Sequence, residues 1–143
     1  MNDTEIVTSR QFAAPPPQVF RAFSDPAILA RWWGPEGFSN TFKVFDMEPG
    51  GLWRFVMHGP DGVNYPNECE FVAVDAPARI VFRHVSGPQF EATLLFKEQD
   101  GGTWLDWTMR FDSAAECARI SKFAVEANEQ NLDRLQHQLD KMA

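Results

Sequence analysis

The stretch SAAECARISKFAVEANEQNLDRLQHQLDKM (residues 113–142) decides the fold. It opens with a capping-box pattern, in which the Ser113 side chain caps a backbone amide and Glu116 reaches back. Apolar residues then recur at helical spacing to the end of the stretch. A helix of roughly 30 residues is about 45 Å long, enough to cross a whole sheet. The stripe comprises Ile120, Phe123, Ala127, Asn131, Leu132, Leu135, Leu139 and Met142.

The chain before this helix alternates between apolar and polar residues, as strands do. Turn sequences such as EPGG, DAPA and QDGG separate the later segments, which is typical of an antiparallel meander. The pattern predicts seven strands, at residues 4–12, 41–47, 52–58, 68–74, 80–85, 91–98 and 103–111.

Two short helices are predicted between the first and second strands. The prolines of PPPQVFRAFSDP (residues 15–26) favour a helix start, and a second helix at residues 26–33 ends at Gly34. The predicted fold class is α+β, a helix-grip fold. A curved antiparallel seven-stranded sheet wraps around the long C-terminal helix, and the two short helices plug one end of the groove.

Composition fits one domain spanning residues 1–143, rich in aromatic side chains, with 13 Phe and 5 Trp. The net charge of −7 argues against a nucleic-acid partner. We find no signal peptide and no long apolar run, so we expect a cytoplasmic protein without membrane insertion. Cys69 and Cys117 form no C-x-x-C pair and are interpreted as small buried hydrophobic residues.

Strand parity places Trp, Phe and Met side chains together on the inner face. Wide rings with flexible methionines favour an interior that surrounds a ligand cavity, and the alternative is a solid core. The predicted wall consists of Trp53, Phe55, Met57, Phe71, Phe82, Trp107 and Met109, and the predicted mouth of Trp33, Phe38 and Tyr65. The outer face carries Arg54, Glu70 and Arg83, which suit cross-strand ion pairs.

Two polar residues interrupt this apolar pattern. Asn128 lies on the stripe of the last helix and His84 has inward parity near a strand end. Each either contacts a polar group of a ligand or is satisfied by the protein itself. His84 and Glu68 are the candidates for proton transfer in an enzyme, but no acid–base pair can be identified. We expect no metal, because the three histidines lack ligand spacing, and no cofactor.

The adjacent Trp32 and Trp33 need separate explanations, because neighbouring helical side chains point about 100° apart. One packs the helix onto the sheet and the other lines the cavity mouth beside Phe38. We assign the packing role to Trp32 and the lining role to Trp33, and the reverse assignment stays open.

FRAFSDPAILARWWGPEGF, EPGGLWRFVMHGPDG, VDAPARIVF, GGTWLDWTMRF and NEQNLDRL together resemble the family of homologues of the activator of the ninety-kilodalton heat-shock chaperone ATPase. That family belongs to the START-like (SRPBCC) superfamily, and the resemblance covers nearly the whole chain. It implies a helix-grip fold with a deep hydrophobic cavity. Many members carry Trp where this chain has Asn128, and eukaryotic activators carry a separate N-terminal domain.

Three functions follow as hypotheses. The first is a binding module for a small hydrophobic or amphipathic molecule, acting as a monomer or homodimer. The second is a START-like enzyme of the cyclase, aromatase or hydrolase type, since the superfamily contains such enzymes. The third is a co-regulator of the chaperone ATPase, which predicts an exposed apolar patch or an acidic docking face.

Overall fold

The computed structural model describes residues 3–142 and has the predicted order of elements. The seven strands are β1 (Glu5–Phe12), β2 (Ser39–Phe45), β3 (Leu52–His58), β4 (Asn64–Asp75), β5 (Arg79–His84), β6 (Phe90–Gln99) and β7 (Gly102–Arg110). The helices are α1 (Pro16–Ser24), α2 (Pro26–Trp32) and α3 (Ala114–Met142). The prediction of a seven-stranded sheet with two short helices and one long helix is therefore confirmed.

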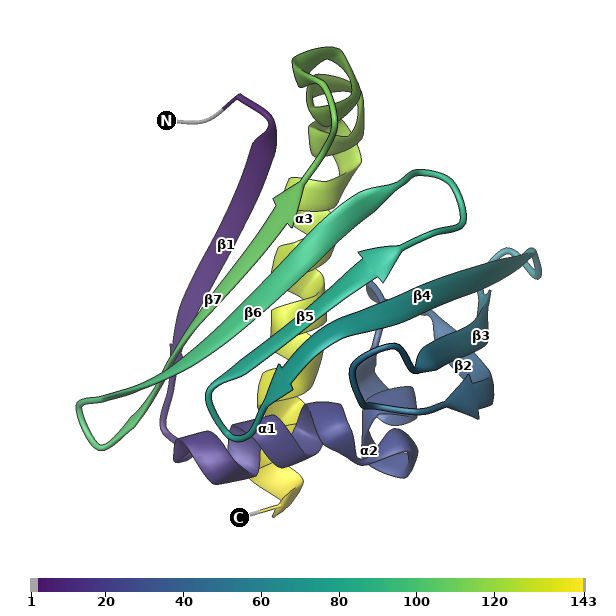
Figure 1. Cartoon of the computed structure of the whole chain (residues 1–143). Helices are drawn as coiled ribbons and strands as arrows, with labels where there is room; N and C mark the ends of the chain where they lie inside the picture. The colour runs from purple at the N-terminus through teal and green to yellow at the C-terminus, as the bar shows by residue number, and fades with distance from the viewer. Residues whose placement is uncertain (1–2, 143) are drawn as a thin grey trace.

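All strand pairs are antiparallel, in the order β1-β7-β6-β5-β4-β3-β2. The first strand forms one edge of the sheet, where it pairs with β7, the last strand in sequence, along its whole length. Figure 1 shows α3 running diagonally behind the sheet, with α1 and α2 across one end. The backbone of α3 comes closest to β1, α1 and α2. The interior under β3, β4 and β5 is therefore filled by side chains rather than by the long helix.

The start of β4 differs from the prediction, which placed its first residue at Glu68. The ladder between β3 and β4 extends four residues further, to the pair His58–Asn64. It includes Pro66, whose missing N–H usually marks the end of a strand. Here β4 has β3 alone as its neighbour, since pairing with β5 begins only at Cys69. The proline therefore lies on an edge, where no ladder bond is lost.

The N-terminus of α3 follows half of the capping-box prediction. The Glu116 amide donates to Ser113 Oγ at 3.1 Å, as expected. The Glu116 carboxylate instead accepts from Arg119 Nε at 3.2 Å, one turn along the helix. An ion pair on the exposed face thus replaces the predicted return bond.

Cys69 and Cys117 are free thiols and are buried, as expected. Burial raises the pKa of both thiols, so they remain protonated, apolar side chains. Within residues 3–142, no helix is long and apolar enough to cross a membrane. The cytoplasmic location stays a prediction.

Candidate functional site

Trp32 and Trp33 have different partners at the end of α2, although their own rings meet edge-on with centroids 5.7 Å apart. Trp32 is fully buried, and its Nε1 donates to the Ala22 carbonyl of α1 at 3.0 Å. Its ring meets Phe23 edge-on, with centroids 4.8 Å apart. Trp32 thus joins α2 to α1. Trp33 is the C-cap residue of α2, in extended conformation, and its side chain enters the interior.

The rings of three sheet residues surround Trp33. Its centroid lies 5.3 Å from Trp53, 5.7 Å from Trp107 and 6.3 Å from Phe82. Trp53 in turn stacks on Phe55 at 4.4 Å. We call the space enclosed by Trp53, Phe82 and Trp107, which the ring of Trp33 fills, the aromatic chamber. Trp33 occupies the middle of this chamber, deeper than the mouth position beside Phe38 that the sequence suggested.

A small cavity remains beside Trp33, with a volume of about 10 Å³. That is about the space that one water molecule needs. Its lining is almost wholly apolar and contains no titratable group; the residues are Phe23, Leu29, Trp33, Phe45, Met47, Trp53, Phe71, Ile80, Phe82 and Leu94. The interior beside Trp33 is therefore filled chiefly by aromatic side chains, and the deep cavity that the family resemblance implied is not found there.

The twelve residues predicted to line the cavity fall into two groups. Nine are buried: Trp33, Trp53, Phe55, Phe71, Phe82, His84, Trp107, Met109 and Asn128. Phe38, Met57 and Tyr65 lie nearer the surface, where Tyr65 is 42% exposed. The rings of Phe38 and Tyr65 are 5.9 Å apart, and Gly34 lies against Met57. These four residues share one place at the end of the β3–β4 hairpin.

The loop that follows Trp33 is held by a single cation of α3. The Arg134 guanidinium donates to the carbonyls of Gly34, Pro35 and Phe38 at 2.9 Å each. Longer bonds reach the carbonyls of Arg31 at 3.1 Å and Trp33 at 3.3 Å. Burial lowers the pKa of Arg134, although a guanidinium keeps its charge in proteins.

Two neighbouring side chains of α3 fix the amides of the same loop. Asn131 Oδ1 accepts from the Gly34 amide at 3.2 Å, and Gln130 Oε1 accepts from the Glu36 amide at 3.1 Å. Sequence reasoning missed Gln130 and Arg134, and gave Asn131 only a packing role. Their polar spacing on α3 resembles an ordinary solvated helix face. The end of α2 was the one available signal for Arg134, because the last carbonyls of a helix need donors from elsewhere.

Asn128 lies three residues before Asn131 but contacts the sheet. Its Nδ2 lies 3.3 Å from Met109 Sδ on β7 and 3.5 Å from Thr8 Oγ1 on β1. A thioether is a weak acceptor and the second contact is long. The amide is therefore buried with poor partners, on the same side of α3 as Asn131 but toward the sheet rather than the loop.

His84 is held by protein groups on both ring nitrogens. Nδ1 lies 2.8 Å from the Pro88 carbonyl, and Nε2 lies 2.7 Å from Asn67 Oδ1. The ring stacks on Phe90 at 4.9 Å, almost parallel. Burial lowers the pKa of His84, outweighing its backbone hydrogen bonds, which raise it.

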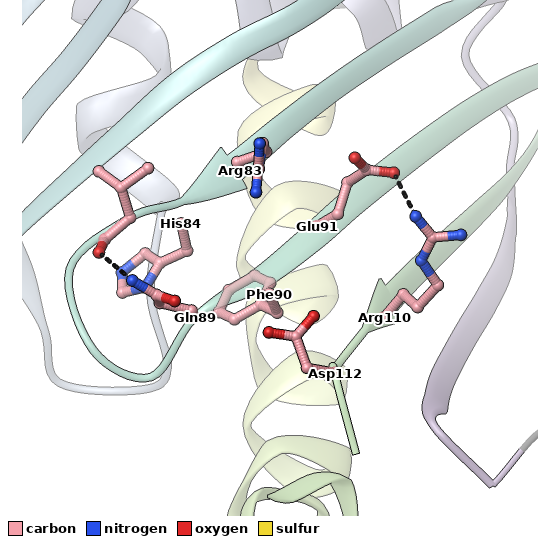
Figure 2. Close-up of a pocket in the computed structure, with 8 residues that line it drawn as sticks. Arg83, His84, Gln89, Phe90, Glu91, Arg110 and Asp112 are labelled. Atoms are coloured by element: carbon pink, nitrogen blue, oxygen red, sulfur yellow. Dashed lines mark hydrogen bonds and ion pairs between the residues drawn. The ribbon is translucent and has the colours of Figure 1, made fainter. Parts of the chain in front are cut away.

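A polar hollow of about 130 Å³ adjoins His84 where the sheet ends, shown in Figure 2. Its lining comprises Arg83, His84, Val85, Gln89, Phe90, Glu91, Arg110 and Asp112. Glu91 bridges to Arg110 at 3.4 Å, and both belong to the outer row of the sheet, together with Arg83. This row carries alternating charges that neutralise one another, and each exposed pair stabilises the fold only weakly.

The structure does not bring His84 and Glu68 together as an acid–base pair. Glu68 Oε1 accepts from Arg54 Nε at 2.8 Å, in a cross-strand ion pair on the outer face, where the sequence suggests Glu70 rather than Glu68 for such pairs. In the ladder between β4 and β5, His84 lies opposite Cys69, the residue after Glu68, and Cys69 faces inward. Successive strand residues point to opposite faces, so the sheet separates the two groups. Within residues 3–142 there is also no cluster of three metal-binding side chains.

Comparison with protein-family models gives one match, to "Activator of Hsp90 ATPase homolog 1-like protein", over residues 13–140. This chain belongs to that family. A comparison with curated protein sequences gives no match. The family assignment predicted from the sequence motifs is thus confirmed over most of the chain.

Solved structures similar to this family member confirm the helix-grip fold. A protein from Rhodobacter sphaeroides is 26% identical, with a TM-score of 0.89, and the match covers 99% of this chain and 96% of the other. A Nitrosomonas europaea protein is 19% identical, with a TM-score of 0.90 and coverage of 99% and 97%. An AHSA1 protein from Silicibacter pomeroyi is 23% identical, with a TM-score of 0.80 and coverage of 97% and 99%.

Proposed function

We propose that this protein binds a small apolar or amphipathic molecule in the aromatic chamber. The family and its fold support a ligand-binding module in general terms. The observation that carries the proposal is that the rings of Trp53, Phe82 and Trp107 meet around Trp33 on the inner side of the sheet. The lining of the adjoining cavity contains no charged group. Ligand sites in proteins have this mainly apolar, aromatic lining.

Trp33 has to leave the centre of the chamber for a ligand to enter. The remaining cavity of about 10 Å³ is far smaller than the roughly 150 Å³ in which an engineered apolar cavity binds benzene. Trp33 is the C-cap residue of α2 and precedes Gly34, whose φ of 102° is a backbone conformation that favours glycine. Movement of this one side chain opens a space the size of an indole ring.

Native mass spectrometry of the protein with libraries of lipids and aromatic compounds tests the proposal. We expect a binder of one-to-one stoichiometry that raises the melting temperature. At a free concentration of 100 times Kd, such a ligand stabilises the fold by about 2.7 kcal/mol. Phe82→Leu in the chamber should weaken binding, whereas Phe123→Ser on the exposed face of α3 should not. A folded protein that binds no compound contradicts the proposal.

A second candidate, co-regulation of a chaperone ATPase, takes its support from the family description and one surface feature. Phe123 is 72% exposed and Val125 is 52% exposed, both in the first half of α3. Large exposed apolar side chains are frequent at protein-binding surfaces. Chaperone ATPase rates measured with wild type and Phe123→Ser distinguish this candidate. An unchanged rate with the wild type removes it.

A further inference from the structure

Two hydrogen-bond donors are buried in the aromatic chamber without an acceptor. Among residues 3–142, the indole Nε1 atoms of Trp53 and Trp107 have no hydrogen-bond partner. Their side chains are only 2% and 4% exposed. Most buried polar groups in proteins are paired, so each exception needs an explanation.

Two tryptophans outside the chamber have paired indoles. Trp32 Nε1 donates to the Ala22 carbonyl and Trp104 Nε1 donates to Asp106 Oδ1, both at 3.0 Å. The ring neighbours of Trp53 are aromatic side chains, which offer only their weakly accepting faces. Both unpaired indoles contact the ring of Trp33.

We infer that the ligand of the chamber is a neutral molecule with an apolar ring body and at least one carbonyl- or ether-type oxygen, which accepts from Trp53 or Trp107 when Trp33 moves aside. This inference rests on the proposed function and specifies its ligand class. The oxygen follows from the two unpaired donors. Neutrality follows from the cavity lining, because a carboxylate or ammonium group without a counter-charge is strongly disfavoured there.

A third unpaired atom, Asn40 Oδ1, lies outside this argument. The Asn40 amide donates to the Trp33 carbonyl at 2.8 Å, so it holds the backbone of Trp33. We call Trp33 the gate residue, because its side chain has to move for a ligand to enter. Its oxygen is an acceptor and does not compete for the same ligand atom.

The pair 1-indanone and indane tests the inference, because the two molecules match an indole in size and differ in one carbonyl. In Trp33→Ala, which vacates the centre of the chamber, we expect 1-indanone to bind on the order of tenfold more tightly than indane, the worth of one hydrogen bond. If no indole N–H donates to the ligand, indane should bind more tightly than 1-indanone, because the carbonyl of 1-indanone loses its hydrogen bonds to water without a replacement. Equal or tighter binding of indane overturns the inference.

Matched variants identify the donors. Added to Trp33→Ala, Trp53→Phe and Trp107→Phe together should abolish the preference for 1-indanone. Trp104→Phe removes an indole N–H that is already paired with Asp106, outside the chamber, so it should leave the preference unchanged. A preference that survives the loss of both Trp53 and Trp107 donors contradicts the inference.

The wild-type protein provides a second measurement if Trp33→Ala does not fold. In a ¹⁵N-labelled sample, titration with 1-indanone should shift the indole N–H signals of Trp53 or Trp107 and not that of Trp104, which lies on the other face of β7 and donates to Asp106. Failure of 1-indanone to bind either protein, or binding without these shifts, overturns the inference. The proposed function survives either result if indane or a library compound still binds in the chamber, and it fails only if nothing does.

Discussion

Asn128 and Asn131 are both buried on α3, less than one turn apart, yet their amides are satisfied very differently. Asn131 accepts from the Gly34 amide at 3.2 Å. Asn128 has only a thioether at 3.3 Å and a hydroxyl at 3.5 Å. A buried polar side chain stabilises a fold only as far as its partners are good ones. The two residues therefore form a natural pair for comparison.

Asn131→Leu should lower the free energy of unfolding by about 1–3 kcal/mol, because it leaves the Gly34 amide buried without an acceptor. Asn128→Leu should be neutral or slightly stabilising, since a leucine of similar size needs no partner. Urea denaturation of both variants measures the difference. A large loss of stability in Asn128→Leu would show that the contacts with Thr8 and Met109 are essential.

His84 makes stability depend on pH in a definite direction. Burial lowers its pKa in the folded state, so the unfolded chain binds the proton more tightly. Stability should therefore be fully present above the ordinary histidine pKa of about 6.5 and fall as pH decreases below it. The slope from this single group is at most about 1.4 kcal/mol per pH unit.

The measurement is urea denaturation of wild type and His84→Gln between about pH 8 and pH 5, the range around the ordinary histidine pKa. Carboxylates begin to titrate at the acid end, so the difference between the two proteins is the quantity of interest. The free energy of unfolding of the wild type minus that of His84→Gln should therefore decrease as the pH falls below about 6.5. Parallel curves for the two proteins would contradict the effect.

The loop between α2 and β2 is held by a residue that lies far away in the sequence, on another helix. Arg134 is 100 residues from Gly34 in the chain, and it donates to the loop carbonyls of Gly34 and Phe38 and to the Arg31 carbonyl in the last turn of α2. A guanidinium presents five donors in a rigid plane, whereas a lysine ammonium is a point charge with three. The position of the loop decides how deep Trp33 reaches, so Arg134 is also part of the gate.

Arg134→Lys should lower the free energy of unfolding by about 1–3 kcal/mol, the range for losing charged hydrogen bonds to buried carbonyls. The amides of Gly34 and Phe38 should also exchange with solvent faster, as measured by hydrogen exchange. Arg119→Lys on the exposed side of the same helix is the control and should leave both quantities unchanged. Equal exchange rates in wild type and Arg134→Lys would show that the loop is held by other contacts.

The elements themselves were predictable because each follows a local rule. Alternation and turn sequences predict the strands to within a few residues, and the largest difference is the start of β4, four residues before the predicted one. Parity also placed Trp53, Phe82 and Trp107 on one face. The depth of Trp33 was not predictable, because it depends on hydrogen bonds to Arg134 and Asn131, which are distant in sequence. The unpaired indoles depend in the same way on which side chains meet in the interior.

At the scale of the whole molecule, the sheet and helices enclose the chamber unevenly. Figure 1 shows α1 and α2 across one end of the sheet, while α3 crosses diagonally from the other. The backbone of α3 comes closest to β1, α1 and α2. In our proposal a ligand therefore enters past the short loop between Trp33 and β2, because this loop carries the side chain that has to move.

This arrangement predicts gated binding. If Trp33 must swing out first, a ligand binds only to the fraction of molecules in which the chamber is open, and its apparent affinity falls by that fraction. In stopped-flow mixing followed by indole fluorescence, the observed rate for the wild type should level off at high ligand concentration, at the opening rate of the gate. Trp33→Ala should instead show a rate that rises linearly with concentration, because the chamber is already open. Arg134→Lys should raise the plateau, since it loosens the loop that carries the gate. A linear dependence in the wild type would show that ligands enter without displacing Trp33, and would place the entrance elsewhere in the fold.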